Sequence, residues 1–327
     1  MTTPHDPYDD AELEAFADEV QSELVSERWA GWGQEAPVLP AREQPDPAPA
    51  TAFWRPRRVA AAALLLALAI WPWFRERRTL PIEYEVAVHL DEGVALQQGV
   101  PARLRLGQVL ETQPGMHARI AVPGMGEVVL EPESRLRVGD ARAIDGEHLL
   151  ALESGAVTAS ILAPPRRFQL GTPGGVAVDL GCVYRAEVLD EERTLVRVVA
   201  GAVSFEAHGR QVYVPQGASV LAQVATGPGT PILDDAPQRL RQILAQLDAG
   251  QPLGVGDDHF AILFELCRPE DSLSIWHLMM HAEGAQRFVY AKLLDRLVPM
   301  PEPYEAEACV EPGSEANLAW YALQPWS

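Results

Sequence analysis

The sequence predicts a mainly β protein with an α-helical C-terminal part and one transmembrane helix ahead of the β domain. Three observations predict this fold class. An uninterrupted apolar run spans residues 59–74, polar and apolar residues alternate in short stretches between Tyr84 and Gln223, and apolar residues recur at helical spacing after Pro231. Alternation of polar and apolar residues is typical of strands with one buried face, and recurrence of apolar residues at helical spacing is typical of amphipathic helices. With 327 residues, the chain is long enough for two or three folded units.

Residues 1–32 are predicted to form an acidic amphipathic helix. Positions 6–27 hold nine acidic side chains and no basic one. The apolar stripe is too short to bury a core by itself, so we expect it to contact a protein partner or to stay partly unfolded without one. The expected contact residues include two tryptophans, because buried tryptophans often dominate interfaces; they are Leu13, Phe16, Val20, Leu24, Trp29 and Trp32. A solvated acidic tail, or tryptophans that pack on lipid, are the open alternatives.

Residues 33–55 are predicted to be an extended tether rather than a packed element. Proline recurs there among alanine and polar residues, at positions 37, 40, 45, 47 and 49. Such a composition favours a semi-rigid spacer. The tether would separate the acidic helix from the bilayer.

Residues 56–78 are predicted to form a single transmembrane helix. The apolar run has three arginines on each side and includes Val59, Leu64, Leu66, Ile70 and Phe74. Its span of about 24 Å is short for a hydrocarbon core of roughly 30 Å, but flanking arginines and tryptophans can close the difference. A cleaved signal peptide would begin within the first few residues, and a soluble core helix would not usually carry arginines at both ends. Equally basic flanks leave the orientation undecided.

Residues 82–230 are predicted to form an all-β domain of short antiparallel strands, arranged as a sandwich, a roll or a solenoid. Alternation is clear in stretches bounded by glycine, proline or acidic turn residues, at 102–106, 119–122, 194–198 and 210–214. His208 and Gly209 are predicted to reverse the chain between strands at 203–205 and 212–214.

Residues 236–327 are predicted to form a small helical bundle or a helical-repeat cap. Pro237 opens the first expected helix and Gly250 closes it. Further helices are expected at 259–267, 272–282 and 285–298, and the prolines at 299, 301 and 303 are expected to end the series. Apolar residues near the C-terminus are expected to dock on this bundle, namely Leu318, Trp320, Tyr321, Leu323 and Trp326.

Charge and motifs argue against several function classes. A formal net charge of −20 disfavours nonspecific binding to a phosphate backbone. His277 and His281 have the spacing of metal ligands on one helix face, with His259 and Cys267 one helix away. The glutamate that serves as the base in a zinc hydrolase is missing between them. We therefore expect no catalytic residue, no metal and no cofactor.

The three cysteines are scattered and form no Cys-x-x-Cys pair. They predict no disulfide framework, although one disulfide is allowed if the second half of the chain lies outside the cytoplasm. Cys182 has apolar neighbours and is expected to be a buried, inert thiol.

The order of the β motifs resembles the FecR domain, an extracytoplasmic module named for the iron-citrate regulator FecR. The matching series begins with Leu106-Gly107 and Thr112, followed by the strand 118–122. It continues with the motifs Leu130-x-Pro132-x-Ser134 and Leu152-x-x-Gly155-x-Val157. It ends with the stretches 168–173, 176–184 and 194–203. Where the family usually has Gly-Thr-x-Phe, this chain has Gly181-Cys182-Val183-Tyr184. Glycines at strand ends suit backbone positions that need a positive φ or a close approach.

The resemblance implies a topology and a role. It implies a cytoplasmic N-terminal segment, one helix across the inner membrane and a periplasmic C-terminal part. In that scheme the chain relays an envelope signal to an extracytoplasmic-function sigma factor without catalysing a reaction, and the arm of residues 1–32 faces the sigma factor. This arm is short for an anti-sigma domain, and helices follow Pro231 in place of the family's small mixed domain. The alternative is a non-signalling envelope protein whose FecR-like domain binds peptidoglycan, glycan or another protein.

Overall fold

The structure is a computed structural model that describes residues 83–91, 93, 100–139, 147–250 and 259–326. The predicted arm, tether and transmembrane helix lie outside these residues, so their predictions stay predictions. Within the described residues, no helix is both long enough and apolar enough to cross a bilayer.

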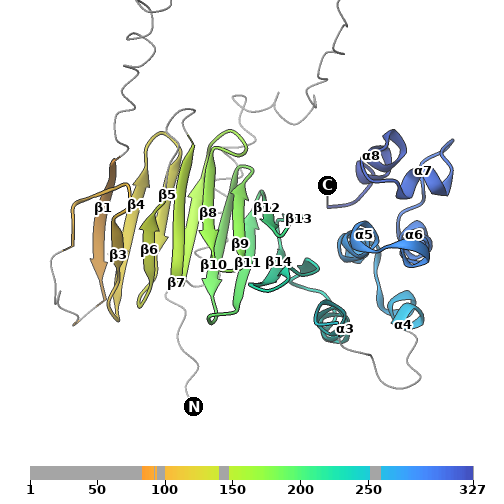
Figure 1. The fold of residues 1–327 in the computed structure, drawn as a ribbon, viewed down its shortest axis with the longest axis horizontal. Coiled ribbons are helices and arrows are strands. Elements are labelled where there is room, and N and C mark those ends of the chain that lie inside the picture. The colour runs from red at the N-terminus through yellow and green to blue at the C-terminus, as the bar shows by residue number, and fades with distance from the viewer. Residues whose placement is uncertain (1–82, 92, 94–99, 140–146, 251–258, 327) are drawn as a thin grey trace, which may run out of the picture. The chain divides into compact units, whose positions relative to one another are not determined.

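The β domain consists of two sheets that share one long strand, β7 (Figure 1). The first sheet contains β1 (Glu83–Leu90), β2 (Arg103–Arg105), β4 (Met116–Val122), β5 (Gly126–Leu130), β7 (His148–Ile161), β10 (Cys182–Val188), β11 (Arg193–Ala200), β14 (Ala218–Gln223), β15 (Gly227–Pro228) and β16 (Ile232–Leu233). The second sheet contains β3 (Val109–Glu111), β6 (Arg135–Val138), β7, β8 (Phe168–Thr172), β9 (Gly175–Asp179), β12 (Ala202–Ala207) and β13 (Arg210–Pro215).

The apolar positions of both sheets meet in one core, which corresponds to the sandwich among the three predicted arrangements. Strand β11 shows the pattern, because its buried and solvent-facing residues alternate along the strand. Phe168 and Phe205 from the second sheet belong to the same buried cluster as Tyr184 and Val196 from the first. The predicted all-β domain is therefore confirmed.

Strand β7 passes from one sheet to the other at Gly155. Residues 150–154 pair with β6, whereas residues 155–161 pair with β10. Gly155 has a φ of 78°, a value that an L side chain rarely adopts. The motif 152–157 is therefore a bend inside one strand, because the chain changes sheets there without reversing direction.

The remaining pairings follow the prediction with one exception. Strand β12 and strand β13 form the expected hairpin, with Phe205 opposite Val212, and both His208 and Gly209 have positive φ in the turn. Among the described strands, every pair is antiparallel except β7 and β8, which run parallel over four residue pairs. Local alternation does not reveal strand direction, so this pair could not be predicted.

The C-terminal part is helical, as predicted, and has more helices than predicted. It contains α3 (Gln238–Asp248), α4 (His259–Leu266), the 3-10 helix η1 (Pro269–Asp271), α5 (Ser272–His281), α6 (Gly284–Leu297), α7 (Ala306–Val310) and α8 (Glu315–Tyr321). The prolines at 299–303 do not end the series. They form the connection to α7, and Ser314 then caps α8 by accepting a hydrogen bond from the Asn317 amide at 3.0 Å.

The tail residues divide between docked and exposed. Trp320 is fully buried, and Tyr321 and Trp326 pack against the helical core. Leu318 and Leu323, however, are 59% and 53% exposed. Their predicted docking is wrong. Leu318 lies on the face of α8 opposite to the buried Ala316 and Trp320, and Leu323 lies beyond the end of this helix.

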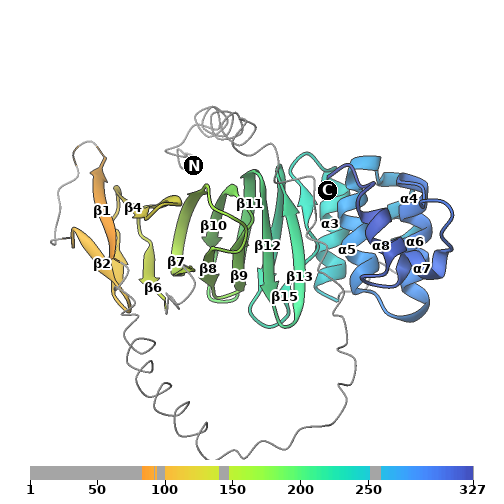
Figure 2. The ribbon, with the colours of Figure 1, turned by 90° about the horizontal axis from the view of Figure 1, so that it is seen from above.

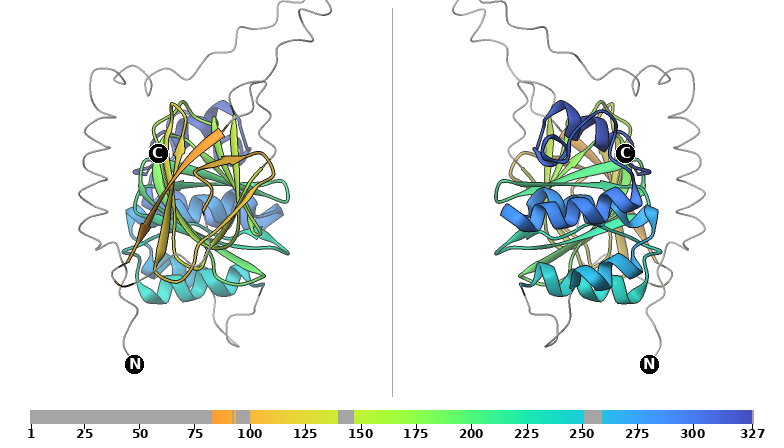
Figure 3. Two further views of the ribbon diagram at one scale, coloured as in Figure 1. Left: turned by 90° about the vertical axis from the view of Figure 1, so that its left-hand side faces the viewer. Right: turned by 90° about the vertical axis from the view of Figure 1, so that its right-hand side faces the viewer.

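The helices lie beside the end of the β domain that holds β13 and β14 (Figures 1 and 2). Seen from that end, the helices stand in front of the strands, whereas the other end presents the early strands (Figure 3). Leu233 and Trp326 pack against both the β core and the helical core. Leu273 of α5 belongs to the β core itself. These contacts place the candidate site.

Candidate functional site

The predicted partner-binding residues Leu13, Phe16, Val20, Leu24, Trp29 and Trp32 lie outside the described residues. The same holds for the predicted membrane-spanning residues Val59, Leu64, Leu66, Ile70 and Phe74. What the structure does describe is the surface where β13, β16 and the C-terminal tail meet α5 and η1.

His277 and His281 bind the backbone of the edge strand β13. His277 hydrogen-bonds to the backbone of Tyr213, and His281 to that of Gln211. The two histidines can reach two residues of one strand because residues four apart on a helix and residues two apart on a strand are separated by similar distances. An unpaired strand edge is a template for another chain, and α5 covers this one.

Both histidines are held in the neutral form. Burial, His281 and Arg210 together lower the pKa of His277 to about 3, and burial with Arg210 lowers that of His281 to about 4. An Arg210 Nη2 hydrogen bond of 2.9 Å occupies the Nδ1 lone pair of His281. His281 therefore donates to Gln211 from Nε2.

This geometry works against the metal-site reading of the two histidines. A metal would need a lone pair on Nδ1 or Nε2 of His281. The Nδ1 lone pair accepts the hydrogen bond from Arg210, and Nε2 carries a proton. The guanidinium beside them would also repel a cation. In the described part of the chain, no group of three or more His, Cys, Asp or Glu side chains is placed to hold a metal ion.

An aromatic cluster lies beside His277. The ring of Trp326 lies 5.4 Å from that of Tyr321, 6.0 Å from that of Tyr213 and 6.3 Å from those of Trp276 and His277. The Trp326 indole N–H donates to Ser272 Oγ at 2.9 Å, which fixes the ring. Aromatic pairs at these distances contribute about 0.5–1.5 kcal/mol each beyond burial. The cluster joins the last residues of the chain to the β domain.

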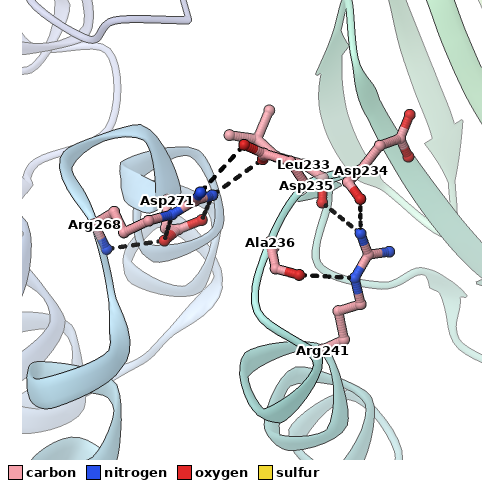
Figure 4. Close-up of polar contacts among 7 residues, drawn as sticks. All are labelled: Leu233, Asp234, Asp235, Ala236, Arg241, Arg268 and Asp271. Atoms are coloured by element: carbon pink, nitrogen blue, oxygen red, sulfur yellow. Dashed lines mark hydrogen bonds and ion pairs between the residues drawn. The ribbon is translucent and has the colours of Figure 1, made fainter.

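Arginines hold the connection between β16 and the helices (Figure 4). Arg268 binds Asp235 with two hydrogen bonds of 3.0 and 3.1 Å, and also binds the buried Asp271. Arg241 donates to the carbonyl oxygens of Leu233, Asp234 and Ala236. Asp234 and Asp235 are ion-pair acceptors in the turn before α3. Asp234 binds Arg197 at 2.7 Å, and Asp235 binds Arg268.

Three residues of the β motif series meet at the bend of β7. The Ser134 amide donates to Thr112 Oγ1 at 2.9 Å, and the Ala156 amide donates to Ser134 Oγ at 2.8 Å. A Cβ on Gly155 would lie 2.1 Å from Ser134 Oγ, so only glycine fits. Thr112, Ser134 and Gly155 are therefore scaffold residues that hold strand ends together.

Cys182 is fully buried, as predicted, and its thiol has a specific partner. Its Sγ donates to Asp179 Oδ2 at 2.6 Å, and the Gly181 amide donates to Asp179 Oδ1 at 2.8 Å. Burial raises the pKa of Asp179 to about 7 against these hydrogen bonds, and burial and Asp179 raise the pKa of Cys182. All three cysteines are free thiols, so the allowed disulfide does not form.

Sequence reasoning missed the cationic members of this surface, Arg210, Arg241 and Arg268. The residues next to each arginine in the sequence are typical of an exposed position, and the groups that each arginine binds belong to other elements. His277 and His281 were identified by their spacing of four residues. That spacing suits two hydrogen bonds to the backbone of one strand as well as it suits two bonds to a metal ion.

Part of the β domain matches a known family model. Residues 108–204 match the family model described as FecR protein. The chain carries a FecR domain. The match covers the strands from β3 into β12, including the Thr112, Ser134 and Gly155 positions, and it confirms the resemblance drawn from the ordered motifs.

Solved structures with a likeness to this chain include two of a proposed anti-sigma factor from Parabacteroides distasonis. The 1.65 Å structure has 14% identity and a TM-score of 0.33, and covers 42% of this chain and 65% of its own. The 2.50 Å structure has 17% identity and a TM-score of 0.34, and covers 43% of this chain. This chain thus spans 65% of the length of both. A search of curated proteins finds no match.

Proposed function

We propose that the chain is a non-enzymatic, membrane-anchored FecR-like regulator. In this proposal the FecR domain lies outside the cytoplasmic membrane, the run 59–74 is the anchor, and the acidic arm binds a cytoplasmic regulator of the sigma-factor type. The FecR family match at residues 108–204 carries the proposal. The apolar run with arginines on both sides supports the anchor.

The scaffold character of the FecR domain is consistent with relaying a state rather than catalysing a reaction. Its motif residues hold strands together, and its buried thiol is bound to a carboxyl group away from solvent. A rigid domain can transmit a binding event to the membrane anchor through β1, which is the first described strand after the apolar run.

The arm can be tested with a matched pair of variants in the full-length chain. Val20→Asp places a charge within the apolar stripe of the predicted helix, and Ser22→Asp adds the same charge on the opposite face. After crosslinking in cells, we expect the native chain and Ser22→Asp to recover a sigma factor and Val20→Asp to lose it. Equal recovery by both variants, or recovery of no transcription regulator by the native chain, contradicts the proposal.

The topology needs its own measurement. In spheroplasts, added protease should degrade the FecR domain and leave an N-terminal tag intact, because the proposed anchor separates them. Degradation of both ends, or of neither, contradicts the membrane arrangement. If deletion of residues 1–30 leaves transcription unchanged and alters envelope integrity, the chain is a structural envelope protein instead.

A further inference from the structure

The junction of the FecR domain and the helices contains a cavity of about 540 Å³. Tyr213 and Pro215 of β13 line one side, and Pro325 and Trp326 of the tail line another. Glu270 of η1 is the charged residue in its lining. A cavity of this volume is within the range of small-ligand and side-chain sites.

The aromatic rings in this cavity are held in place by contacts outside it. Trp326 is fixed by Ser272 and by the rings of Trp276 and Tyr321. Tyr213 is fixed by its strand pairing and by the ring of Tyr321, whose centroid lies 6.3 Å away. Pre-positioned rings bind a ligand without a further loss of side-chain entropy.

The charge around the cavity is incompletely neutralised. Arg268 is occupied by Asp235 and Asp271, and Arg241 by three carbonyl oxygens (Figure 4). Arg197 is occupied by Asp234. These contacts occupy three arginines of the junction, and a fourth, Arg210, donates to His281 in the last turn of α5. Glu270 has no ion-pair partner among the described residues. The lining of the cavity therefore contains one unpaired carboxylate together with two aromatic rings.

We infer that this cavity binds an arginine side chain presented by a protein partner. A guanidinium is weakly hydrated and planar, stacks on the faces of tyrosine and tryptophan, and pairs with a carboxylate. The lining of Tyr213, Trp326 and Glu270 supplies both kinds of contact. The inference does not depend on the regulator role, because binding is measured on the purified chain.

The test uses the full-length chain in detergent and two dye-labelled peptides, Ala-Pro-Arg-Pro-Ala and the same peptide with citrulline in place of arginine. Citrulline keeps the shape of the side chain and removes its charge. Fluorescence anisotropy at 150 mM salt, where the Debye length is about 8 Å, suppresses the general attraction of the acidic chain. We expect binding of the arginine peptide and weaker binding of the citrulline peptide.

Matched variants assign the binding to the cavity. Glu270→Gln should weaken binding of the arginine peptide by about threefold to fivefold. Glu265→Gln removes the same charge from the exposed face of α4, outside the cavity, and should leave binding unchanged. Tyr213→Leu should weaken binding by about threefold, and Tyr213→Phe, which keeps the ring, should retain it.

Three outcomes overturn the inference. They are equal affinity for the two peptides, an equal effect of Glu270→Gln and Glu265→Gln, and binding of a chitin oligosaccharide at this site without binding of the arginine peptide. The last outcome would identify a carbohydrate site. Circular dichroism of each variant shows whether a loss of peptide binding reflects unfolding. If Tyr213→Leu fails to fold, Tyr213→Phe still tests whether an aromatic ring without the hydroxyl group is enough for binding.

Discussion

Asp179 shows how one buried residue couples the FecR domain to pH. Its carboxyl is 1% exposed and accepts hydrogen bonds from the Gly181 amide and the Cys182 thiol. Burial raises its pKa to about 7 from an ordinary value of 3.8. A raised pKa in the folded state means that the folded form holds a proton that the unfolded form loses. The contribution to stability is therefore present below about pH 4 and is lost as the pH rises through about 7.

Asp179→Asn should remove this dependence, because asparagine keeps the size and the acceptor oxygen and does not ionise. Relative to the native chain, the variant should gain stability as the pH rises from 5 to 8. Urea unfolding of both proteins at several pH values measures the difference. A difference that stays constant over that range would show that Asp179 does not titrate in the folded protein there.

Gly155 and Gly209 form a second residue-scale comparison. Both have positive φ, 78° and 73°, but a Cβ on Gly155 would overlap Ser134 whereas a Cβ on Gly209 would meet nothing within 4 Å. Gly209→Ala should cost about 1–2 kcal/mol from backbone strain alone. Gly155→Ala adds overpacking and should cost about 3 kcal/mol or more. Chemical denaturation measures the free energy of unfolding of both variants. Similar losses of stability would contradict the conclusion that only glycine fits at the bend of β7.

At the scale of elements, the contact between α5 and β13 depends on neutral histidines. The pKa of His277 is lowered to about 3 and that of His281 to about 4, below the ordinary 6.5. Lowered values in the folded state give stability that is present above about pH 6.5 and is lost as the pH falls toward 3–4. The titratable and charged groups that face them are Arg210 and each other. Their dependence is opposite in sign to that of Asp179.

His277→Gln should reduce the loss of stability in acid, because glutamine can still donate to the Tyr213 carbonyl and has no charge to gain. We expect the unfolding midpoint to fall less between pH 6.5 and 4.5 than in the native chain. Tryptophan fluorescence reports the transition, since Trp276 and Trp326 lie in the cluster around this histidine. An unchanged acid dependence would assign it to other groups.

At the scale of the whole described structure, two apolar cores meet at a polar connection. Leu233 and Trp326 pack on both cores, and Arg268 links the turn before α3 to η1. Asp271, which is 1% exposed, depends on this arginine for its neutralisation. The connection therefore couples the stability of the helices to that of the FecR domain.

Arg268→Met should destabilise the helical part by about 2 kcal/mol, because it leaves the buried Asp271 carboxylate without its cation. The side chain of Arg268 is 36% exposed, which keeps the loss below that of a fully buried pair. Arg193→Met breaks an exposed pair with Asp190 and should have a much smaller effect. Thermal unfolding tests both, and Arg268→Met together with Asp271→Asn should recover much of the loss. No recovery would mean that the arginine acts through packing rather than charge.

Much of this fold could be predicted from local pattern. Alternation located the strands at 103–105, 116–122, 193–200 and 210–215. The turn at His208 and Gly209 was identified because these residues lie between two expected strands, and the structure gives both a positive φ. Helical spacing located α3 to α6 to within a residue or two. The docking of the tail was only half correct, because Leu318 and Trp320 share a short helix and only packing decides which face is buried.

The sequence by itself determined the alternation of β and helical segments, the acidic charge and the FecR motif order, since these depend on neighbouring residues and their spacing. Only the tertiary structure decided that β7 joins two sheets and that His277 and His281 bind a strand edge. It also decided that Glu270, which has no ion-pair partner among the described residues, lines one cavity with Tyr213 and Trp326. Those features join residues that are far apart in the chain. Their distances follow from how complete elements pack, which no local pattern contains.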